Sequence, residues 1–321
     1  MRIMMVNSKK RSVAIILLNW NSYDDTSQCL LSLGELKYDP FHVYIVDNQS
    51  GDDSYQKLIN DYDAGAYPIG VTFIQSGGNL GFAGGNNKGI KQAYEDGHDY
   101  IWLLNNDTTI DSNALHPLVE VIDRDEKVGI VGSKIYFSDT GLLWFAGGEV
   151  NCYSGSTHHI GYKERDIGQY DEIKSVKYIV GCSLLFRREL VESVGYLEED
   201  YFLYYEDTDW NIRAGRLGWK ILYVPDSIVY HKISSASSSR EVAPFFAYYN
   251  IRNAYLMILR NEGRGLARIS AFMNVLWRVF EYHVRVVVKN QDSKRRRSNL
   301  IMLGALDGFR ERSGKKEFQI K

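Results

Sequence analysis

Short apolar runs that alternate with helix-like stretches constrain this chain more than any other feature. The apolar runs are residues 13–18, 43–46, 71–74, 100–104 and 128–131. The helix-like stretches lie at 25–36, from 52–53 onward, at 83–95 and at 114–123. Apolar strands without polar alternation, separated by helices, are typical of a parallel sheet covered on both faces. We therefore predict an α/β fold with a mostly parallel sheet between helices.

Polar side chains directly follow three of these apolar runs. Asn19 follows the first run, Asp47 follows the second, and the tripeptide 105–107 follows the fourth. In open α/β sheets, ligands bind outside the carboxyl ends of the strands. The sequence therefore predicts that these polar groups meet at one edge of the sheet.

The pattern changes beyond residue 134. Residues 134–180 are punctuated by glycine and predict hairpins. Helices are predicted at 206–217, 245–260 and 268–289, strands at 220–224 and 228–231, and a Ser-rich loop at 234–239. We expect a sheet domain over residues 1–239 and a C-terminal helical, basic extension over residues 240–321.

Charge is distributed unevenly along the chain. The whole chain has 38 Lys and Arg against 40 Asp and Glu, which gives a net charge of −2. From Arg264 onward there are 14 basic and 5 acidic residues, so this segment carries +9 and the body before it −11. A basic segment on an acidic body favours an anionic surface as partner. Nucleic acid is not favoured, because the body is acidic and contains no recognised nucleic-acid module.

The predicted helix at 268–289 is amphipathic, with apolar residues at helical spacing, and the basic cluster 294–297 follows it. Segments of this kind bind anionic membrane surfaces. Packing on the sheet domain and a homodimer interface are alternatives that explain the same pattern. Our hypothesis is that the extension brings the protein to the cytoplasmic face of the membrane.

The cysteines and the apolar runs favour a cytoplasmic location. The three cysteines are odd in number and lack CxxC spacing, which is typical of a reducing compartment. No run approaches the roughly 18–20 apolar residues that span a bilayer. The N-terminus has no apolar stretch long enough for a signal peptide. Peripheral contact with the membrane stays compatible with these features.

Asp107 and His231 are candidate metal ligands, because each lies just beyond a predicted strand. A carboxylate in a polar turn can bind a hard divalent cation, which prefers oxygen ligands. The alternatives are an Asp that caps the next turn and a histidine with a structural role.

The glycine-rich segment 77–89 has neither the GxGxxG pattern nor the GK[ST] ending of a P-loop. Its density of Gly and Asn indicates close approach of the backbone to a ligand. A flexible connection with helix caps is the alternative.

Three carboxylates, Glu206, Asp207 and Asp209, occur within four residues. They repel one another unless a cation, an arginine or a proton separates them. One interpretation is a general base that acts on an acceptor hydroxyl. The other is an acidic helix N-terminus, in which Arg213 pairs with Asp209 one turn later.

Ordered segments along most of the chain resemble the inverting family 2 glycosyltransferases with the GT-A fold, especially the rhamnosyltransferase-like members. These segments are 17–22 (LLNWNS), 46–50 (VDNQS), 79–89 (NLGFAGGNNKG), 103–107 (LLNND), 181–188 (GCSLLFRR), 201–209 (YFLYYEDTD), 218–219 (GW), His231, 248–253 (YYNIRN) and 307–309 (DGF). The resemblance covers residues 12–260 and, more loosely, the tail.

The resemblance implies roles for individual residues and makes the sheet domain the catalytic domain. It implies a catalytic base at Asp207, a Mg²⁺ or Mn²⁺ ion at Asp107 and His231, and acceptor or donor-sugar contacts at Glu206, Asp209 and Trp210. It implies donor binding by Asn19, Asn21, Asp47, Asn79, Asn87, Asn105, Asn106 and Asp107. Asn105 stands where the family's DxD-type motif has its first Asp, which weakens that end of the site for a hard cation.

The implied reaction is an inverting transfer of a sugar from a nucleotide-diphosphate donor to a glycan or lipid-linked acceptor in surface polysaccharide synthesis. By resemblance the donor is dTDP-rhamnose, with UDP-galactofuranose or another UDP-sugar as the alternative. A nucleotidyltransferase needs a basic loop after the first strand, and residues 19–22 are uncharged. A non-catalytic sugar-nucleotide-binding scaffold is a further alternative, which the presence of Asp107 and Asp207 disfavours.

Overall fold

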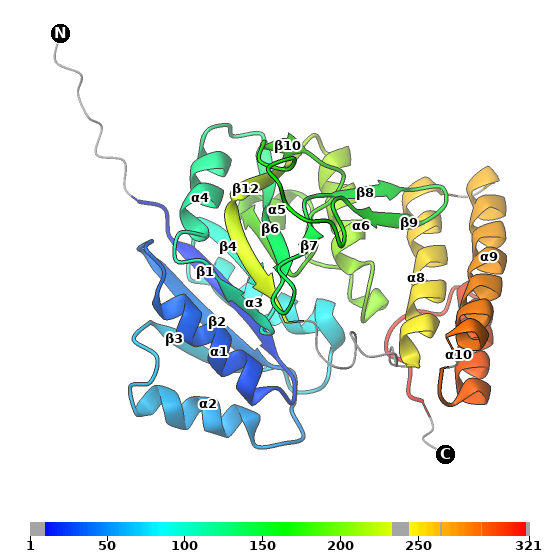
Figure 1. Cartoon of the computed structure of the whole chain (residues 1–321), viewed down its shortest axis with the longest axis horizontal. Coiled ribbons are helices and arrows are strands. Elements are labelled where there is room, and N and C mark those ends of the chain that lie inside the picture. Colours follow the sequence, from blue (N-terminus) through cyan, green and yellow to red (C-terminus); the bar gives the residue numbers. More distant parts are fainter. Residues whose placement is uncertain (1–9, 233–243, 264, 290, 319–321) are drawn as a thin grey trace, which may run out of the picture.

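The computed structural model describes residues 10–232, 244–263, 265–289 and 291–318. Its central feature is a large sheet with the strand order β10-β12-β6-β11-β4-β1-β2-β3, to which β5 and β7 pair at the side (Figure 1). The strands are β1 (Val13–Asn19), β2 (Phe41–Asp47), β3 (Val71–Gln75), β4 (Tyr100–Leu104), β5 (Thr108–Ile110), β6 (Val128–Phe137), β7 (Leu143–Phe145), β10 (Lys174–Ser175), β11 (Ser183–Arg187) and β12 (Lys220–His231). A separate hairpin consists of β8 (Gly148–Asn151) and β9 (Ser156–His159).

The N-terminal half of the sheet is parallel, as the sequence predicts. Strand β1 pairs in parallel with β2 and β4, and β2 pairs in parallel with β3. Their side chains form the main core, in which residues 13–17 are completely buried. The helices beside the sheet are α1 (Tyr23–Gly34), α2 (Ser54–Asp63), α3 (Gly81–Glu95), α4 (Leu115–Asp123), the short α5 (Glu189–Ser193), η1 (Glu199–Tyr201) and α6 (Glu206–Arg216).

Two strand predictions differ from the structure. Strand β11, which the sequence pattern did not separate from its surroundings, inserts antiparallel between β4 and β6. The predicted strands 220–224 and 228–231 are one strand, β12, whose register shifts between Val224 and Ile228. The intervening Pro225 lacks a backbone N–H, so this irregularity lies where the ladder has no donor to lose.

Close packing accounts for several glycines of the glycine-rich segment. Most of it is the first half of α3, and Gly85 and Gly89 face the sheet, where a Cβ atom would collide with Leu18 and Ile16. At Gly81 the backbone has a φ of +72°, and a Cβ atom would collide with the Phe202 carbonyl. These glycines therefore allow close packing of helix, sheet and loop, and the approach of a ligand to this segment stays a prediction.

From residue 244 onward, the described residues form the helices α8 (Phe245–Glu262), α9 (Leu266–Val288) and α10 (Lys294–Phe309). They pack against one another around Ile251, Ile258, Val275 and Ile301. The sequence predicted the first two helices but only a basic cluster where α10 begins. The predicted domain boundary at 239/240 and the Ser-rich loop lie outside the described residues, so the division into domains stays a prediction.

Helix α8 holds the loop that precedes α6. The side-chain amide of Asn253, completely buried, donates to the carbonyls of Tyr201, Leu203 and Tyr204 at 2.8–3.0 Å. The guanidinium of Arg252 donates to the Tyr201 carbonyl at 2.9 Å. These contacts account for the motif at residues 248–253 and connect the helical region to the start of α6.

Replacement of Asn253 by Ala should lower the free energy of unfolding by about 3 kcal/mol, since it leaves buried carbonyls without donors. Urea unfolding followed by circular dichroism measures this change. The matched control is Asn299→Ala on the exposed surface of α10, which should change stability by less than about 0.5 kcal/mol. Equal stability of the two variants would contradict the role of Asn253.

Candidate functional site

Asp107 and His231, which are far apart in sequence, meet at one edge of the sheet. Asp107 lies between β4 and β5, and β5 pairs antiparallel with the last residues of β12, so that Thr108 lies opposite His231. The Nε2 atom of His231 is 3.1 Å from Oδ1 of Asp107. The backbone N–H of Lys232 donates to the Asp107 carbonyl at 2.8 Å. The β5–β12 ladder therefore sets the distance between the two predicted metal ligands.

The imidazole of His231 is buried beside the indole ring of Trp144. Its ring lies 4.6 Å from the ring of Trp144, in an edge-to-face arrangement. Burial by itself lowers the pKa of His231, but contacts with Cys182 and Asp107 outweigh it and hold the pKa well above its usual value. The Nδ1 atom is buried and has no hydrogen-bond partner.

This pair of residues fits a cation that is shared with a substrate. Within the described parts of the chain, no group of three or more His, Cys, Asp or Glu side chains is placed to bind a metal. Asp107 and His231 nevertheless supply a carboxylate oxygen and an imidazole Nε2 that lie 3.1 Å apart. Mg²⁺ uses one or two carboxylates and completes its coordination with water and substrate phosphate. The donor set therefore fits an ion held jointly by protein and diphosphate.

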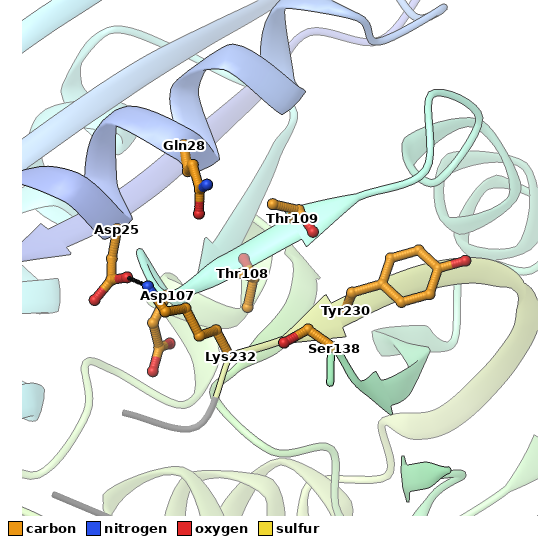
Figure 2. Close-up of a pocket in the computed structure, with 8 residues that line it drawn as sticks. All are labelled: Asp25, Gln28, Asp107, Thr108, Thr109, Ser138, Tyr230 and Lys232. Atoms are coloured by element: carbon orange, nitrogen blue, oxygen red, sulfur yellow. Dashed lines mark hydrogen bonds and ion pairs between the residues drawn. The ribbon is translucent and has the colours of Figure 1, made fainter. Parts of the chain in front are cut away.

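A cavity of about 300 Å³ opens beside Asp107. Figure 2 shows its lining, to which α1, β5 and the end of β12 contribute. The ammonium of Lys232 lies in this lining and pairs with Asp25 at 2.6 Å. Sequence reasoning gave no role to Lys232 or Asp25. The available signal was the position of Lys232, directly after a candidate ligand at a strand end.

Asp207 lies in the first turn of α6, and the N–H groups of other residues orient its carboxylate. Oδ2 accepts from the N–H of Gly181 at 2.8 Å, and Oδ1 accepts from the N–H of Thr208 at 2.6 Å. Burial raises the pKa of Asp207, and the hydrogen bonds from Gly181 and Thr208 offset only part of this effect. The side chain stays partly exposed to solvent. An oriented carboxylate with a raised pKa suits general-base chemistry.

The segment of Gly181 and Cys182 links Asp207 to the tripeptide that contains Asp107. While Gly181 donates to Asp207, the carbonyl of Cys182 accepts from the N–H of Asn105 at 2.9 Å. A side chain at Gly181 would collide with the ring of Phe82. The sequence motif GCSLLFRR contained this segment, but sequence reasoning assigned it no part in the site.

Glu206 is a buried carboxyl group beside Asp207. Its side chain is 4% exposed, and Oε2 has no hydrogen-bond partner. Burial, together with the charge of Asp207, raises its pKa well above the usual value. Both effects favour the protonated form of this carboxyl group.

Asp209 and Trp210 point into the protein. Asp209 pairs with Arg213 at 2.8 Å, as the helical spacing predicted, and accepts from the side-chain amide of Asn261 on α8 at 2.7 Å. Trp210 is 1% exposed and donates to the Gly195 carbonyl at 2.8 Å. The repulsion among the three carboxylates is thus reduced by the raised pKa of Glu206, which favours its neutral form, and by the pairing of Asp209 with Arg213. Direct contacts of Asp209 and Trp210 with a substrate stay untested predictions.

The predicted donor-binding residues gather at the ends of β1 and β2. The amide of Asn19 donates to Asp47 at 2.9 Å, and Asp47 also accepts from the N–H of Ser50 at 3.0 Å. Nearby, Asn21 accepts from the Gly51 N–H at 2.7 Å. Because Asn19 is completely buried and bonded on every side, its contacts are those of a residue that orients Asp47.

The other predicted donor-binding residues have separate positions. Asn79 accepts from the Gly81 N–H at 3.1 Å at the start of α3, and Asn106 donates to Thr26 at 2.8 Å. Asn105 lies two residues before Asp107, and its backbone N–H donates to the Cys182 carbonyl. Asn87 exchanges hydrogen bonds with the backbone of Leu197, so its contacts hold the chain before η1 rather than line the cavity.

The sequence profile of glycosyl transferase family 2 matches residues 13–195, and the chain belongs to this family. Among curated relatives it is 24% identical to the low-salt glycan biosynthesis hexosyltransferase Agl10 of Haloferax volcanii, over 95% of this chain and 93% of the relative. It is 24% identical to an N-acetylglucosaminyl-diphospho-decaprenol L-rhamnosyltransferase of Mycobacterium tuberculosis (78% and 85%). It is 26% identical to the dTDP-rhamnosyl transferase RfbF of Shigella flexneri (87% and 90%).

Solved structures confirm the predicted GT-A fold. A mannosyltransferase of Pyrobaculum calidifontis in complex with GDP-Man and Mn²⁺ aligns with a TM-score of 0.57 at 14% identity, over 95% of this chain and 88% of that one. Residues 1–349 of S. aureus TarS in complex with UDP-GlcNAc align with a TM-score of 0.59 at 16% identity (92% and 81%). A longer TarS structure is covered over only 44% of its length.

The protonation of Glu206 predicts a specific dependence of stability on pH. In the unfolded chain Glu206 ionises above about pH 4.3, whereas in the folded protein its raised pKa shifts ionisation to higher pH. Its contribution to stability is therefore complete at low pH and is lost as the pH rises, at up to about 1.4 kcal/mol per pH unit. The variant Glu206→Gln, which cannot ionise, should gain stability over the wild type between pH 5 and pH 8.

Urea unfolding at each pH measures this gain, with Glu126→Gln at an exposed position as the control. The control should parallel the wild type throughout. A constant difference between Glu206→Gln and the wild type would show that Glu206 is ionised in the folded protein.

Proposed function

We propose that this chain transfers a sugar from a nucleotide-diphosphate donor to a hydroxyl of a glycan or lipid-linked acceptor, with inversion at the anomeric carbon. The main support is the orientation of Asp207, a partly exposed carboxylate with a raised pKa. It is joined through Gly181 and Cys182 to the tripeptide that carries Asp107. Family 2 membership makes sugar transfer the reaction that this arrangement would serve.

In this proposal Asp207 takes the proton of the acceptor hydroxyl as the hydroxyl oxygen attacks the anomeric carbon. The new glycosidic bond forms while the bond between that carbon and the diphosphate oxygen breaks, and the nucleoside diphosphate leaves with the bonding electrons. The hydrogen bonds from Gly181 and Thr208 hold the carboxylate in one orientation. A neutral Glu206 beside it adds no second negative charge near the leaving group.

We further propose that Asp107 and His231 hold a Mg²⁺ or Mn²⁺ ion together with the donor's diphosphate. When bound, such an ion neutralises the charge that develops on the leaving group. Structures of the Pyrobaculum mannosyltransferase and of GalNAc-T7 contain Mn²⁺, which supports a divalent cation here. Lys232 lines the same cavity as Asp107, and its ammonium, paired with Asp25, adds a positive charge to this lining.

We propose dTDP-rhamnose as the donor and surface polysaccharide synthesis as the process. The relatives from Shigella flexneri and Mycobacterium tuberculosis, both named as rhamnosyltransferases, support this donor. The Mycobacterium relative is named for a lipid-linked acceptor, which supports the same class of acceptor for this chain. A UDP-sugar, UDP-galactofuranose included, is the alternative, and TarS with UDP-GlcNAc is the structural neighbour that supports it.

The variant Asp207→Asn should lose transfer by about 10²–10⁴-fold, because an amide cannot accept the hydroxyl proton. Its affinity for the donor should not change. Release of nucleoside diphosphate in the presence of acceptor measures the rate, and titration calorimetry measures donor binding. The control is Asp226→Asn at an exposed position. Full activity of Asp207→Asn would remove the proposed base, and donor binding without transfer by the wild type would favour a scaffold.

The variant Asp107→Asn should bind the donor more weakly and should lose the enhancement by metal. The experiment is calorimetric titration of wild type and variant with dTDP-rhamnose and a panel of UDP-sugars, each with and without Mn²⁺. We expect the wild type to bind one donor at least about tenfold more tightly with Mn²⁺, and the variant to bind it equally weakly under both conditions. Enhancement by Mn²⁺ that survives in Asp107→Asn would place the cation elsewhere.

A further inference from the structure

Helix α9 has an exposed apolar face along its whole length. Its large apolar side chains include Ile269, Met273, Trp277, Phe280, Val284 and Val287, each between 41% and 68% exposed. They follow one another at intervals of three and four residues, which places them on one side of the helix. Large apolar faces of this kind on a protein surface mark sites of interaction.

The fold itself does not require this exposed face. The opposite side of α9, with Ala271, Val275 and Val286, packs into the core shared with α8 and α10. Helix α9 lies at the outer edge of the molecule, on the far side of α8 from the large sheet (Figure 1). The inward residues pack α9 onto α8 and α10. The outward apolar residues are therefore available for a partner.

Basic residues accompany the apolar face. From Leu266 to Phe309 there are eight Lys and Arg and three Asp and Glu. Arg295 and Arg296, at the start of α10, are exposed and lie close to the end of α9 in the chain. The acidic side chains Glu281 and Asp292 are paired with Arg285 and Arg297. Exposed basic residues, Lys289, Arg295 and Arg296, therefore gather where α9 meets α10, at one end of the apolar face.

We propose that α9 binds the surface of a membrane that contains anionic phospholipids. The apolar side chains would enter the boundary between headgroups and acyl chains, and the basic residues would contact the headgroup phosphates. In this arrangement α9 would lie parallel to the membrane surface. No helix in the described part of the chain is long and apolar enough to cross a membrane. Trp277 and Phe280, whose ring centroids are 5.8 Å apart, are aromatic side chains suited to this boundary.

Charge favours a lipid surface over a second copy of this chain. In a two-fold symmetric dimer through α9, each copy presents the same patch to the other. A dimer in which the two α9 helices run parallel would bring their basic ends together and repel, whereas an anionic headgroup layer attracts them. The binding proposed here does not depend on the donor or on the catalytic residues.

The experiment measures binding of the full chain to vesicles by co-sedimentation. Vesicles of phosphatidylcholine with phosphatidylglycerol should bind the wild type, and vesicles of phosphatidylcholine alone should bind it at least about tenfold less. The double variant Trp277→Ser, Phe280→Ser should bind the anionic vesicles at least about tenfold more weakly. The double variant Arg295→Gln, Arg296→Gln should show weaker binding that depends less on salt.

A control replaces two exposed apolar residues outside α9, Leu31→Ser and Ile167→Ser, and should bind like the wild type. Circular dichroism checks that every variant is folded, and light scattering gives the molecular mass. Absence of vesicle binding by the folded wild type, or equal binding by Trp277→Ser, Phe280→Ser, would overturn the proposal. A wild-type dimer that becomes monomeric in that variant, without vesicle binding, would assign the face to a second copy. No outcome depends on catalysis, so a failed transfer assay and a failed membrane proposal are distinguishable.

Discussion

The hydrogen bonds from Arg252 and Asn253 to the loop before α6 are the interaction on which the site depends. Phe202, Tyr204 and Tyr205 have φ values of 63°, 68° and 76°, a region that non-glycine residues rarely adopt. Such a backbone persists only where surrounding contacts outweigh a strain of about 1–3 kcal/mol per residue. The buried donors on α8 supply those contacts. The C-terminal helices therefore help to place the carboxylates at the start of α6.

Backbone hydrogen bonds, rather than long side chains, join the two halves of the site. Asp207 accepts from Gly181, the next residue's carbonyl accepts from Asn105, and Asp107 lies two residues farther along. Strands β4 and β11 anchor both ends of this connection by antiparallel pairing. A site supported by sheet strands is held more precisely than one built on loops alone. The raised pKa of Glu206 favours its neutral form, so this neighbour adds little negative charge beside Asp207.

Residue patterns within short segments predicted the elements whose formation depends on those segments alone. Apolar runs identified β1 to β4, because strands covered on both faces contain few polar residues. The ends of these apolar runs identified Asp47 and Asp107, because polar residues are rare within such strands and first appear where a strand ends. The insertion of β11 and the contact of Asn87 with Leu197, 110 residues away, depend on pairing between distant segments. The glycines of α3 show a similar limit: their sequence density is the same whether a ligand or a sheet approaches the backbone.

Helix α8 lies between the loop that carries the site and the helix that carries the apolar face. Through Asn253 it holds the start of α6, and through Ile251 and Ile258 it packs against α9 and α10. A lipid surface that binds α9 would thus be connected to the site through α8. The acidic body, with a net charge of −11 before Arg264, is repelled by the same anionic headgroups that attract the basic segment. The two opposing charges would orient the enzyme, with its helical end on the membrane and its large sheet directed away from it.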